Sequence, residues 1–331
     1  MYKECIETDV LVTGGSLEGC IAAAELAGMG KKVLLTEKNG SLGGAASNGL
    51  ETILRWNRIA DARAQEYGKL LWEQAGQAEG QKGPLFHDQK AKVVLARLLK
   101  KTGVTVLTHI FPYEMIQENK RVLCRAECKT GTLEIRCGAV IDGQAFQESA
   151  GMAGLRRKQD ADSTEGTAVA EGAVKWNGIP KEALKKRMLP GYEEGEGYLT
   201  GTFGLEPVLD RKGIHYACDG SRCCHSNIFG ETIFNGIKIT LPELSVFTLS
   251  DAMAGLRIYA YMLRDYLREN VPGFEKASII HVAPVMSLYG LRKFERKKAD
   301  RVIPIEMERY SNEEAIVKGI QAARECMQIQ W

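Results

Sequence analysis

The hydrophobic and polar positions near the start of the chain follow the order of a β-α-β unit. Residues 10–12 form an apolar run, and a buried strand is predicted at residues 9–13. Residues 17–28 are rich in alanine and predict a helix with small residues facing a sheet, and Gly30 is expected to end it. Residues 32–37 predict a second strand. This order is typical of an α/β fold with a parallel sheet.

Further elements follow from the same patterns. A helix is expected to end near Gly103, before a strand at residues 104–108. Residues 121–142 alternate apolar and polar positions around a turn at Gly131, which predicts a β-hairpin. Helices are expected at residues 249–270 and near the C-terminus, the latter with Ser311 or Asn312 as N-cap. The glycines of residues 189–207 predict loops between short strands.

The turn between the first predicted strand and helix has the spacing of a dinucleotide-binding loop, with serine at the second glycine position. Its residues are Gly14, Gly15, Ser16, Leu17, Glu18 and Gly19. In such a loop the glycines allow a tight turn, close approach of a pyrophosphate to the backbone, and close helix–strand packing. The free N–H groups at the helix N-terminus favour phosphate. Glu37, at the end of the second predicted strand, is placed to bind a ribose hydroxyl.

Composition narrows the class of protein. The 331 residues are 44% hydrophobic and 26% charged, and the net charge of +2 gives no support for nucleic-acid or membrane binding. The first residues have no apolar core of a signal peptide, and no run is long enough for a membrane span. Nine cysteines without a secretory signal predict mostly reduced thiols and a cytoplasmic protein.

Residues 36–50, TEKNGSLGGAASNGL, carry a resemblance to a known family. The acid Glu37 followed by Gly43 and Gly44 resembles the FAD-dependent oxidoreductases of the glutathione-reductase-like type, which have two dinucleotide-binding domains. The hairpin resembles the β-meander of that family. The resemblance implies a Rossmann-like FAD/NAD(P)-binding domain with β-meander at residues 1–145. It further implies an α+β substrate or cap region at 146–275, and a return segment and C-terminal helix packing on the first domain at 276–331.

The resemblance also implies a function and its residues. FAD would be the cofactor, and hydride would pass between a small-molecule substrate and the flavin. Arg292, in a segment that resembles a "GxR" element near the flavin, is the candidate catalytic residue. The candidate cofactor-binding residues are Gly14, Gly15, Ser16, Leu17, Glu18, Gly19, Glu37, Lys38, Gly43 and Gly44.

Three departures from the family leave an alternative function open. Serine replaces glycine at position 16, Gly143-Gln144-Ala145 replaces an Ala-Thr-Gly turn, and the C-terminal residues predict an ordinary helix where the family has a second flavin-binding segment. The alternative is a non-catalytic binding or structural subunit that has lost FAD. A partner chain or a homo-oligomer would otherwise complete the site.

The densest set of potential metal ligands is Cys218, Cys223, Cys224 and His225. Their spacing differs from that of common zinc sites, so no metal is predicted there. A redox-active thiol pair is a second alternative, and a loop with buried thiols is the favoured interpretation. His215, His225 and His281 are possible acid–base groups, although a lone histidine is more often structural.

Overall fold

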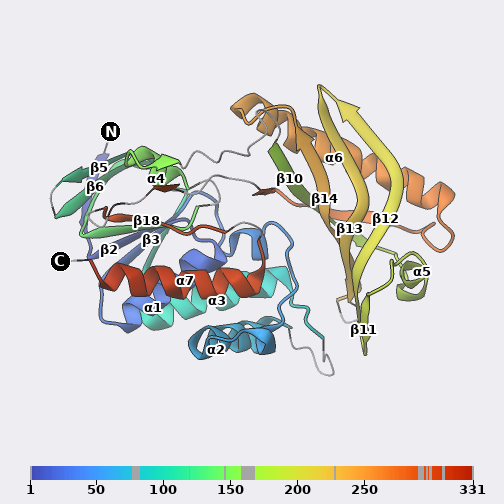
Figure 1. The fold of residues 1–331 in the computed structure, drawn as a ribbon, viewed down its shortest axis with the longest axis horizontal. Helices are drawn as coiled ribbons and strands as arrows, with labels where there is room; N and C mark the ends of the chain where they lie inside the picture. Colours follow the sequence, from blue (N-terminus) through green and yellow to red (C-terminus); the bar gives the residue numbers. More distant parts are fainter. Residues whose placement is uncertain are drawn as a thin grey trace.

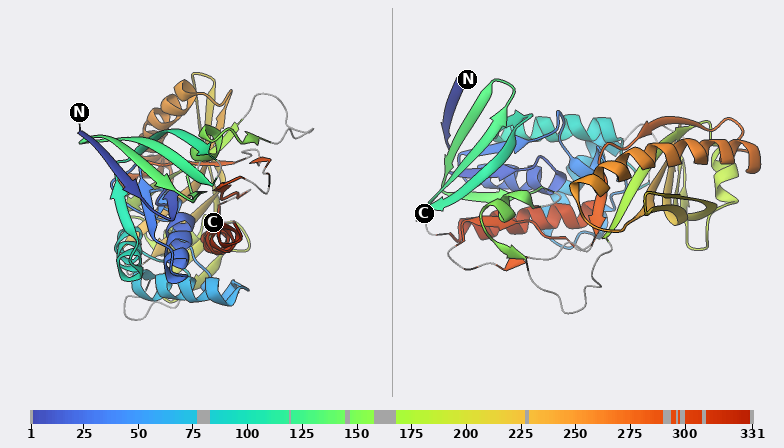
Figure 2. Two further views of the ribbon diagram at one scale, coloured as in Figure 1. Left: turned by 90° about the vertical axis from the view of Figure 1, so that its left-hand side faces the viewer. Right: turned by 90° about the horizontal axis from the view of Figure 1, so that it is seen from above.

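The computed structural model describes most of the 331 residues as two units that lie side by side (Figures 1 and 2). We call them the parallel-sheet unit, built from described residues between 2–157 and 294–329, and the antiparallel-sheet unit, built from residues 168–289. The described residues are 2–76, 83–118, 120–144, 147–157, 168–226, 229–289, 294–295, 297, 300–307 and 310–329.

A five-stranded parallel sheet forms the centre of the first unit. Its strands lie in the order β18-β8-β2-β3-β4. Their bounds are Val302–Pro304, Ala139–Asp142, Val10–Thr13, Val33–Glu37 and Thr105–Thr108. The β2 and β3 strands are buried along their whole length, as expected of strands covered on both faces.

Helices cover one face of this sheet and a second sheet covers the other (Figure 1). Val10 and Val12 of β2 belong to the core shared with the helices, whereas Leu11 between them belongs to the core shared with the second sheet. The helices are α1 (Leu17–Gly28), α2 (Ala62–Leu71), α3 (Asp88–Thr102) and α7 (Asn312–Met327). The unit is therefore a three-layer α/β structure, which confirms the expected fold class.

The second sheet has four strands in the order β1-β7-β6-β5, of which β5, β6 and β7 form an antiparallel meander and β1 pairs with β7 in parallel. Its strands are Tyr2–Glu7, Gly131–Cys137, Arg121–Cys128 and Phe111–Glu118. The β6–β7 pair is the predicted hairpin, closed by Gly131 at φ +144°. Two short elements, α4 (Glu148–Met152) and β9 (Arg156–Arg157), follow, and β9 pairs with β17 (Phe294–Glu295).

The antiparallel-sheet unit is one seven-stranded sheet crossed by a long helix, α6 (Figure 1). Six strands lie in the order β11-β12-β13-β14-β10-β15, and β16 pairs with β10. In chain order the elements are β10 (Ala168–Asn177), α5 (Lys181–Lys185), β11 (Glu193–Gly195), β12 (Tyr198–Arg211), β13 (Ile214–Ser226), β14 (Glu231–Leu241), α6 (Val246–Asn270), β15 (Ser278–Val282) and β16 (Ser287–Tyr289).

The prediction of loops between short strands holds for residues 189–197, where the three-residue β11 lies between turns, and is wrong beyond them. The rest of the stretch belongs to β12, which is 14 residues long. Its glycines mark close packing instead: a Cβ at Gly201 would lie 2.7 Å from the Cβ of Tyr192. Register shifts after Phe203 and Leu205 show that the strand is bulged. Glycine in a strand often marks such a close approach or bulge, and here it does.

The helix predictions hold apart from the first residue of α6. The α1 helix has the expected bounds, and α7 is capped by Ser311, whose hydroxyl accepts a hydrogen bond from Glu314 N. The α6 helix begins at Val246, one turn earlier than expected, because Ser245 and Thr248 form a capping box.

The division into the three expected domains stays a prediction, because the boundary at residues 145–146 lies outside the described residues. Among the described residues, no helix is long and apolar enough to span a membrane.

Candidate functional site

The β2–α1 loop lies at the carboxyl edge of the parallel sheet and is built from close backbone contacts. Gly14 has φ +94°, which favours glycine, and its N–H donates to the carbonyl of Thr36 on β3 at 2.7 Å. A Cβ at Gly14 would lie 2.7 Å from the carbonyl carbon of Gly143, after β8. A Cβ at Gly19 would lie 2.2 Å from the Gly14 oxygen. Both positions therefore require glycine.

Ser16 caps α1 and ties the loop to the end of β8. Its hydroxyl accepts a hydrogen bond from Gly19 N at 3.2 Å and donates one to the Gly143 carbonyl at 2.8 Å. This N-cap geometry is a common role of serine. Serine at the second glycine position thus joins two loops of the same edge, which the sequence did not reveal.

Glu37 is 6% exposed and its carboxylate is held in one orientation. One oxygen accepts from Gly15 N at 2.6 Å, and the other accepts from the backbone and side-chain nitrogens of Asn39, both at 2.7 Å. The acid at the end of β3 therefore fixes the position of the glycine loop. Lys38 beside it pairs with Glu148 at 2.9 Å.

The loop from Gly43 closes the other side of the same edge. The N–H of Gly43 donates to the Gly15 carbonyl at 2.7 Å, and φ is +102° at Gly43 and +50° at Gly44. A Cβ at Gly44 would lie 3.0 Å from the Cβ of Ser16. The two glycine loops are therefore packed directly against each other.

A cavity of about 330 Å³ opens in front of these loops. Of the predicted cofactor-binding residues, Gly14, Ser16, Glu18, Glu37, Lys38 and Gly44 line it. Gly15, Leu17, Gly19 and Gly43 do not line it and pack behind the loops, Leu17 with no exposed surface. The structure thus brings the predicted set to one place, in two layers.

The rest of the cavity wall was not predicted. The polar part comes from Gln144 and Gln147 after β8, next to Gly143. The apolar part comes from α6, the segment before β16 and the segment between β18 and α7. These apolar lining residues are Leu249, Met253, Pro284, Val285, Met286, Ile305, Met307 and Tyr310.

No local sequence signal marks this wall, because its residues come from segments far apart in the chain. The sequence assigned the stripe of α6 to a core, which is correct for Leu256, with no exposed surface, but Met253 also faces the cavity.

Buried carboxylates stand out at this edge. Burial raises the pKa of Asp142, at the end of β8, to about 7, while backbone N–H groups of Ala150 and Gln144 act in the opposite direction. Burial likewise raises the pKa of Glu18 to about 7. A carboxyl group in such surroundings prefers its neutral form.

The candidate catalytic residue Arg292 lies outside the described residues, and so does Ala145. None of the three histidines proposed as acid–base groups lines the cavity. His215 of β13 forms an exposed pair with Asp210 of β12 at 2.7 Å, and His225 bonds to Thr232 at 2.7 Å in the interior.

The cysteine cluster is on a strand, so the expected loop is wrong, although the thiols are buried as expected. Cys223 and Cys224 are neighbours on β13 and belong to two different cores, since successive side chains of a strand point to opposite faces. Burial raises the pKa of Cys218 to about 12 and of Cys224 to about 11. This geometry favours structural thiols over a shared metal or a reactive pair.

Among the described residues, the one group with metal-ligand spacing is His87, Asp88 and Glu231. The ammonium of Lys175 lies 2.6 Å from Asp88 and 2.9 Å from Glu231. The Lys175 ammonium therefore neutralises charge on these carboxylates. Its pair with Asp88 joins α3 of the parallel-sheet unit to the sheet of the antiparallel-sheet unit.

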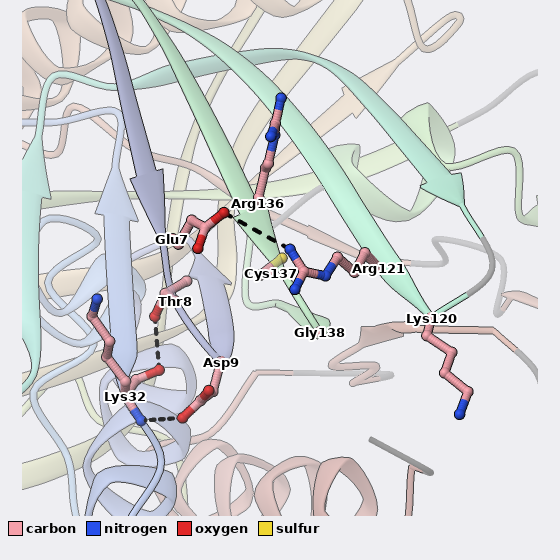
Figure 3. A pocket seen from close by; sticks show the side chains of 9 residues that line it. All are labelled: Glu7, Thr8, Asp9, Lys32, Lys120, Arg121, Arg136, Cys137 and Gly138. Carbon is pink, nitrogen blue, oxygen red and sulfur yellow. Dashed lines mark hydrogen bonds and ion pairs between the residues drawn. The ribbon is translucent and has the colours of Figure 1, made fainter.

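A second hollow, of about 500 Å³, lies at the opposite edge of the parallel sheet, where β2, β3 and β8 begin (Figure 3). Hydrogen bonds tie Thr8 and Asp9 to Lys32, and Arg121 lies 3.8 Å from Glu7. Figure 3 shows Lys120 and Arg136 pointing away from each other. Ligands of open α/β sheets bind at the carboxyl ends of the strands, so this hollow is not the candidate site.

Comparison with known proteins agrees with this geometry. The family model described as FAD dependent oxidoreductase matches residues 9–299. The chain therefore belongs to the FAD-dependent oxidoreductase family. No curated protein has a matching sequence.

Solved structures share the fold at low identity. A geranylgeranyl bacteriochlorophyll reductase-like protein from Thermoplasma acidophilum has a TM-score of 0.59 at 18% identity, over 98% of this chain and 78% of that one. The p-nitrophenol 4-monooxygenase of Pseudomonas putida has a TM-score of 0.58 at 16% identity, over 97% of this chain and 79% of that one. Aklavinone-11 hydroxylase, solved with FAD and aklavinone, has a TM-score of 0.58 at 15% identity, over 96% of this chain and 61% of that one.

Proposed function

We propose that this chain binds FAD in the cavity in front of the two glycine loops and acts as an oxidoreductase on a small molecule, as a member of the glutathione-reductase-like subclass. The observation that carries the proposal is the convergence of the Gly14 turn, the Gly43–Gly44 loop, Glu37 and the amino end of α1 on one cavity.

The residues fit the cofactor in kind. Glu37 has the position of a ribose-binding acid, and the glycine loops let a diphosphate approach the backbone. Bound FAD would supply the redox chemistry by accepting or donating a hydride. The chain's own residues would hold and orient it.

The apolar wall gives the substrate side of the proposal. Leu249 and Met253 of α6, with Met286 and Met307, line the same cavity as the glycine loops. Apolar walls with a few polar groups are typical of small-molecule sites, and they exclude water. We therefore propose an uncharged or partly apolar substrate that enters against α6.

Two glycine variants test cofactor binding. Gly14→Ala places a Cβ against Gly143 at a positive φ, so we expect FAD affinity to fall at least ~100-fold, because the diphosphate loop must shift. Gly30→Ala is the matched control, with φ +83° and no atom near its Cβ. Its FAD affinity should equal that of the wild type.

The measurement is titration with FAD followed by flavin fluorescence, with thermal unfolding of each variant beside it. Equal FAD affinity of Gly14→Ala and Gly30→Ala would overturn the placement of the cofactor. A wild-type chain that binds no FAD would overturn the proposed function and favour the non-catalytic subunit.

A further inference from the structure

Glu18 is a carboxylate in a place where the fold offers positive potential to a ligand. It is the second residue of α1, it is 5% exposed, and it lines the cavity. Its Oε2 has no hydrogen-bond partner among the described residues. An unpartnered, buried carboxylate oxygen at a cavity wall is costly and calls for a functional explanation.

The amino end of a helix attracts anions through its free N–H groups and its dipole. At α1 two of these groups already act within the protein: Gly19 N donates to the Ser16 hydroxyl, and the backbone N–H of Glu18 acts on its own carboxyl group. A phosphate arriving at this helix end would thus meet a side chain that carries the same charge and uses the same donors.

We propose that Glu18 controls the affinity of the diphosphate subsite: its ionised carboxylate competes with an anionic diphosphate for the amino end of α1, and the ligand binds with uptake of one proton from solvent onto Glu18. The proposal rests on the proposed function, because it takes the diphosphate of FAD as the ligand. Glu18 thus opposes binding of the diphosphate, whereas the other residues of the loop favour it.

The packing around Glu18 keeps the carboxylate in place. On α7, a Cβ at Gly319 would lie 2.5 Å from the carbonyl oxygen of Glu18, so the two helices are in close contact at this residue. Helix α1 therefore cannot shift to carry Glu18 away from the cavity without breaking its contact with α7.

Other ionisable groups near the subsite define the controls. Glu37 and Lys38 lie at the end of β3, and both already have partners. Asp142 has a similarly raised pKa, but its oxygens accept the backbone N–H groups of Gln144 and Ala150. Among the described residues, Glu18 also acts electrostatically on Cys20 of α1 and on Tyr310, and Tyr310 is influenced by Glu51 and Glu313 as well. Burial raises the pKa of Glu51, whose carboxylate is paired with Arg222.

Calorimetry of FAD binding in buffers of different ionisation heat tests the proposal, because it counts protons taken up per ligand. The diphosphate of FAD keeps both charges across this pH range, so the ligand itself contributes no proton. Above the pKa of Glu18, about 7, we expect close to one proton per FAD, and an affinity that falls about tenfold per pH unit. Glu18→Gln should take up none and bind more tightly at pH ~8.

Two variants serve as controls. Glu25→Gln changes another buried glutamate of α1, which bonds to Arg63 and Tyr67 away from the cavity, and it should keep the wild-type proton uptake. Asp142→Asn should also keep it. Uptake that persists in Glu18→Gln and vanishes in Asp142→Asn would overturn the assignment to Glu18.

The outcomes separate this inference from the proposed function. FAD binding by wild type and Glu18→Gln with equal affinity and no proton uptake would overturn the role of Glu18 and leave the FAD site standing. Absence of FAD binding in both proteins from pH ~5.5 to ~8.5 would overturn both proposals. Binding at pH ~8 by Glu18→Gln alone supports the role of Glu18.

Discussion

The two units contribute different sets of residues to the cavity wall. The parallel-sheet unit contributes two glycine loops and Glu37 from the first 44 residues, and its later segments add polar and apolar residues: Gln144, Gln147, Ile305, Met307 and Tyr310. The antiparallel-sheet unit contributes Leu249 and Met253 from one helix and residues 284–287 from a segment after it. The glycine loops therefore come from one unit, whereas both units supply apolar side chains. The difference teaches that the loops of the proposed cofactor site are encoded locally, whereas the apolar wall depends on how distant segments pack together.

The largest expected effect concerns the ion pairs that join the two units. Lys175→Met leaves the buried Asp88 of α3 and the half-buried Glu231 of β14 without their cation. We expect the free energy of unfolding to fall by about 3–5 kcal/mol, because a buried charge is left uncompensated. Urea unfolding at pH 7 measures this.

The matched control is Lys212→Met, which removes the cation of an exposed pair with Asp251. It should cost less than ~1 kcal/mol. Equal costs for the two lysine variants would contradict the view that the first pair holds the units together.

An intermediate effect concerns the pH dependence of stability in the parallel-sheet unit. The pKa of Glu18 is raised from 4.5 to about 7, so the folded state favours the neutral acid. The free energy of unfolding should then fall as pH rises from about 4.5 to about 7, and level off above. This contribution is up to ~3 kcal/mol.

Glu18→Gln removes that contribution, so the difference in unfolding free energy between variant and wild type should grow from pH 5 to pH 7. Asp142 shares the same sign and remains in both proteins, so the difference isolates Glu18. Parallel stability curves for the two proteins would contradict the raised pKa.

The smallest effect concerns the cap of α1. Ser16→Ala removes the hydroxyl that accepts from Gly19 and donates to Gly143, and should cost about 0.5–2 kcal/mol. Ser245→Ala removes the cap of α6 at a similar cost but touches no glycine loop. Only Ser16→Ala should weaken FAD binding, as measured by fluorescence titration. A loss of FAD affinity in both would show that general destabilisation, not loop geometry, is the cause.

The sequence predicted the parallel-sheet unit well because its signals are local. The α1 helix has its expected bounds, and Gly19 is required by a contact with Gly14 in that same short segment, whereas Gly14 itself also packs against Gly143 after β8. The β12 and β13 strands were missed because glycines such as Gly201 resemble turn signals. The role of Gly201 in close packing is visible only in the fold, where Tyr192 lies beside it.

The glycine loops of the site could be predicted from the sequence, but its other features could not. Glu18 was expected among the cofactor-binding residues, but its opposing charge becomes evident only from its burial and its unpartnered oxygen. The apolar wall could not be foreseen, because Met253 and Met286 come together through the pairing of distant segments.

The most direct test of the account is the FAD content of the chain after saturation with FAD near pH 6 and removal of unbound cofactor by gel filtration. The visible absorption spectrum gives the ratio of flavin to protein. The account predicts about one FAD per chain for the wild type and for Gly30→Ala, and almost none for Gly14→Ala. A colourless wild-type protein at this pH, with an intact fold by circular dichroism, would contradict it.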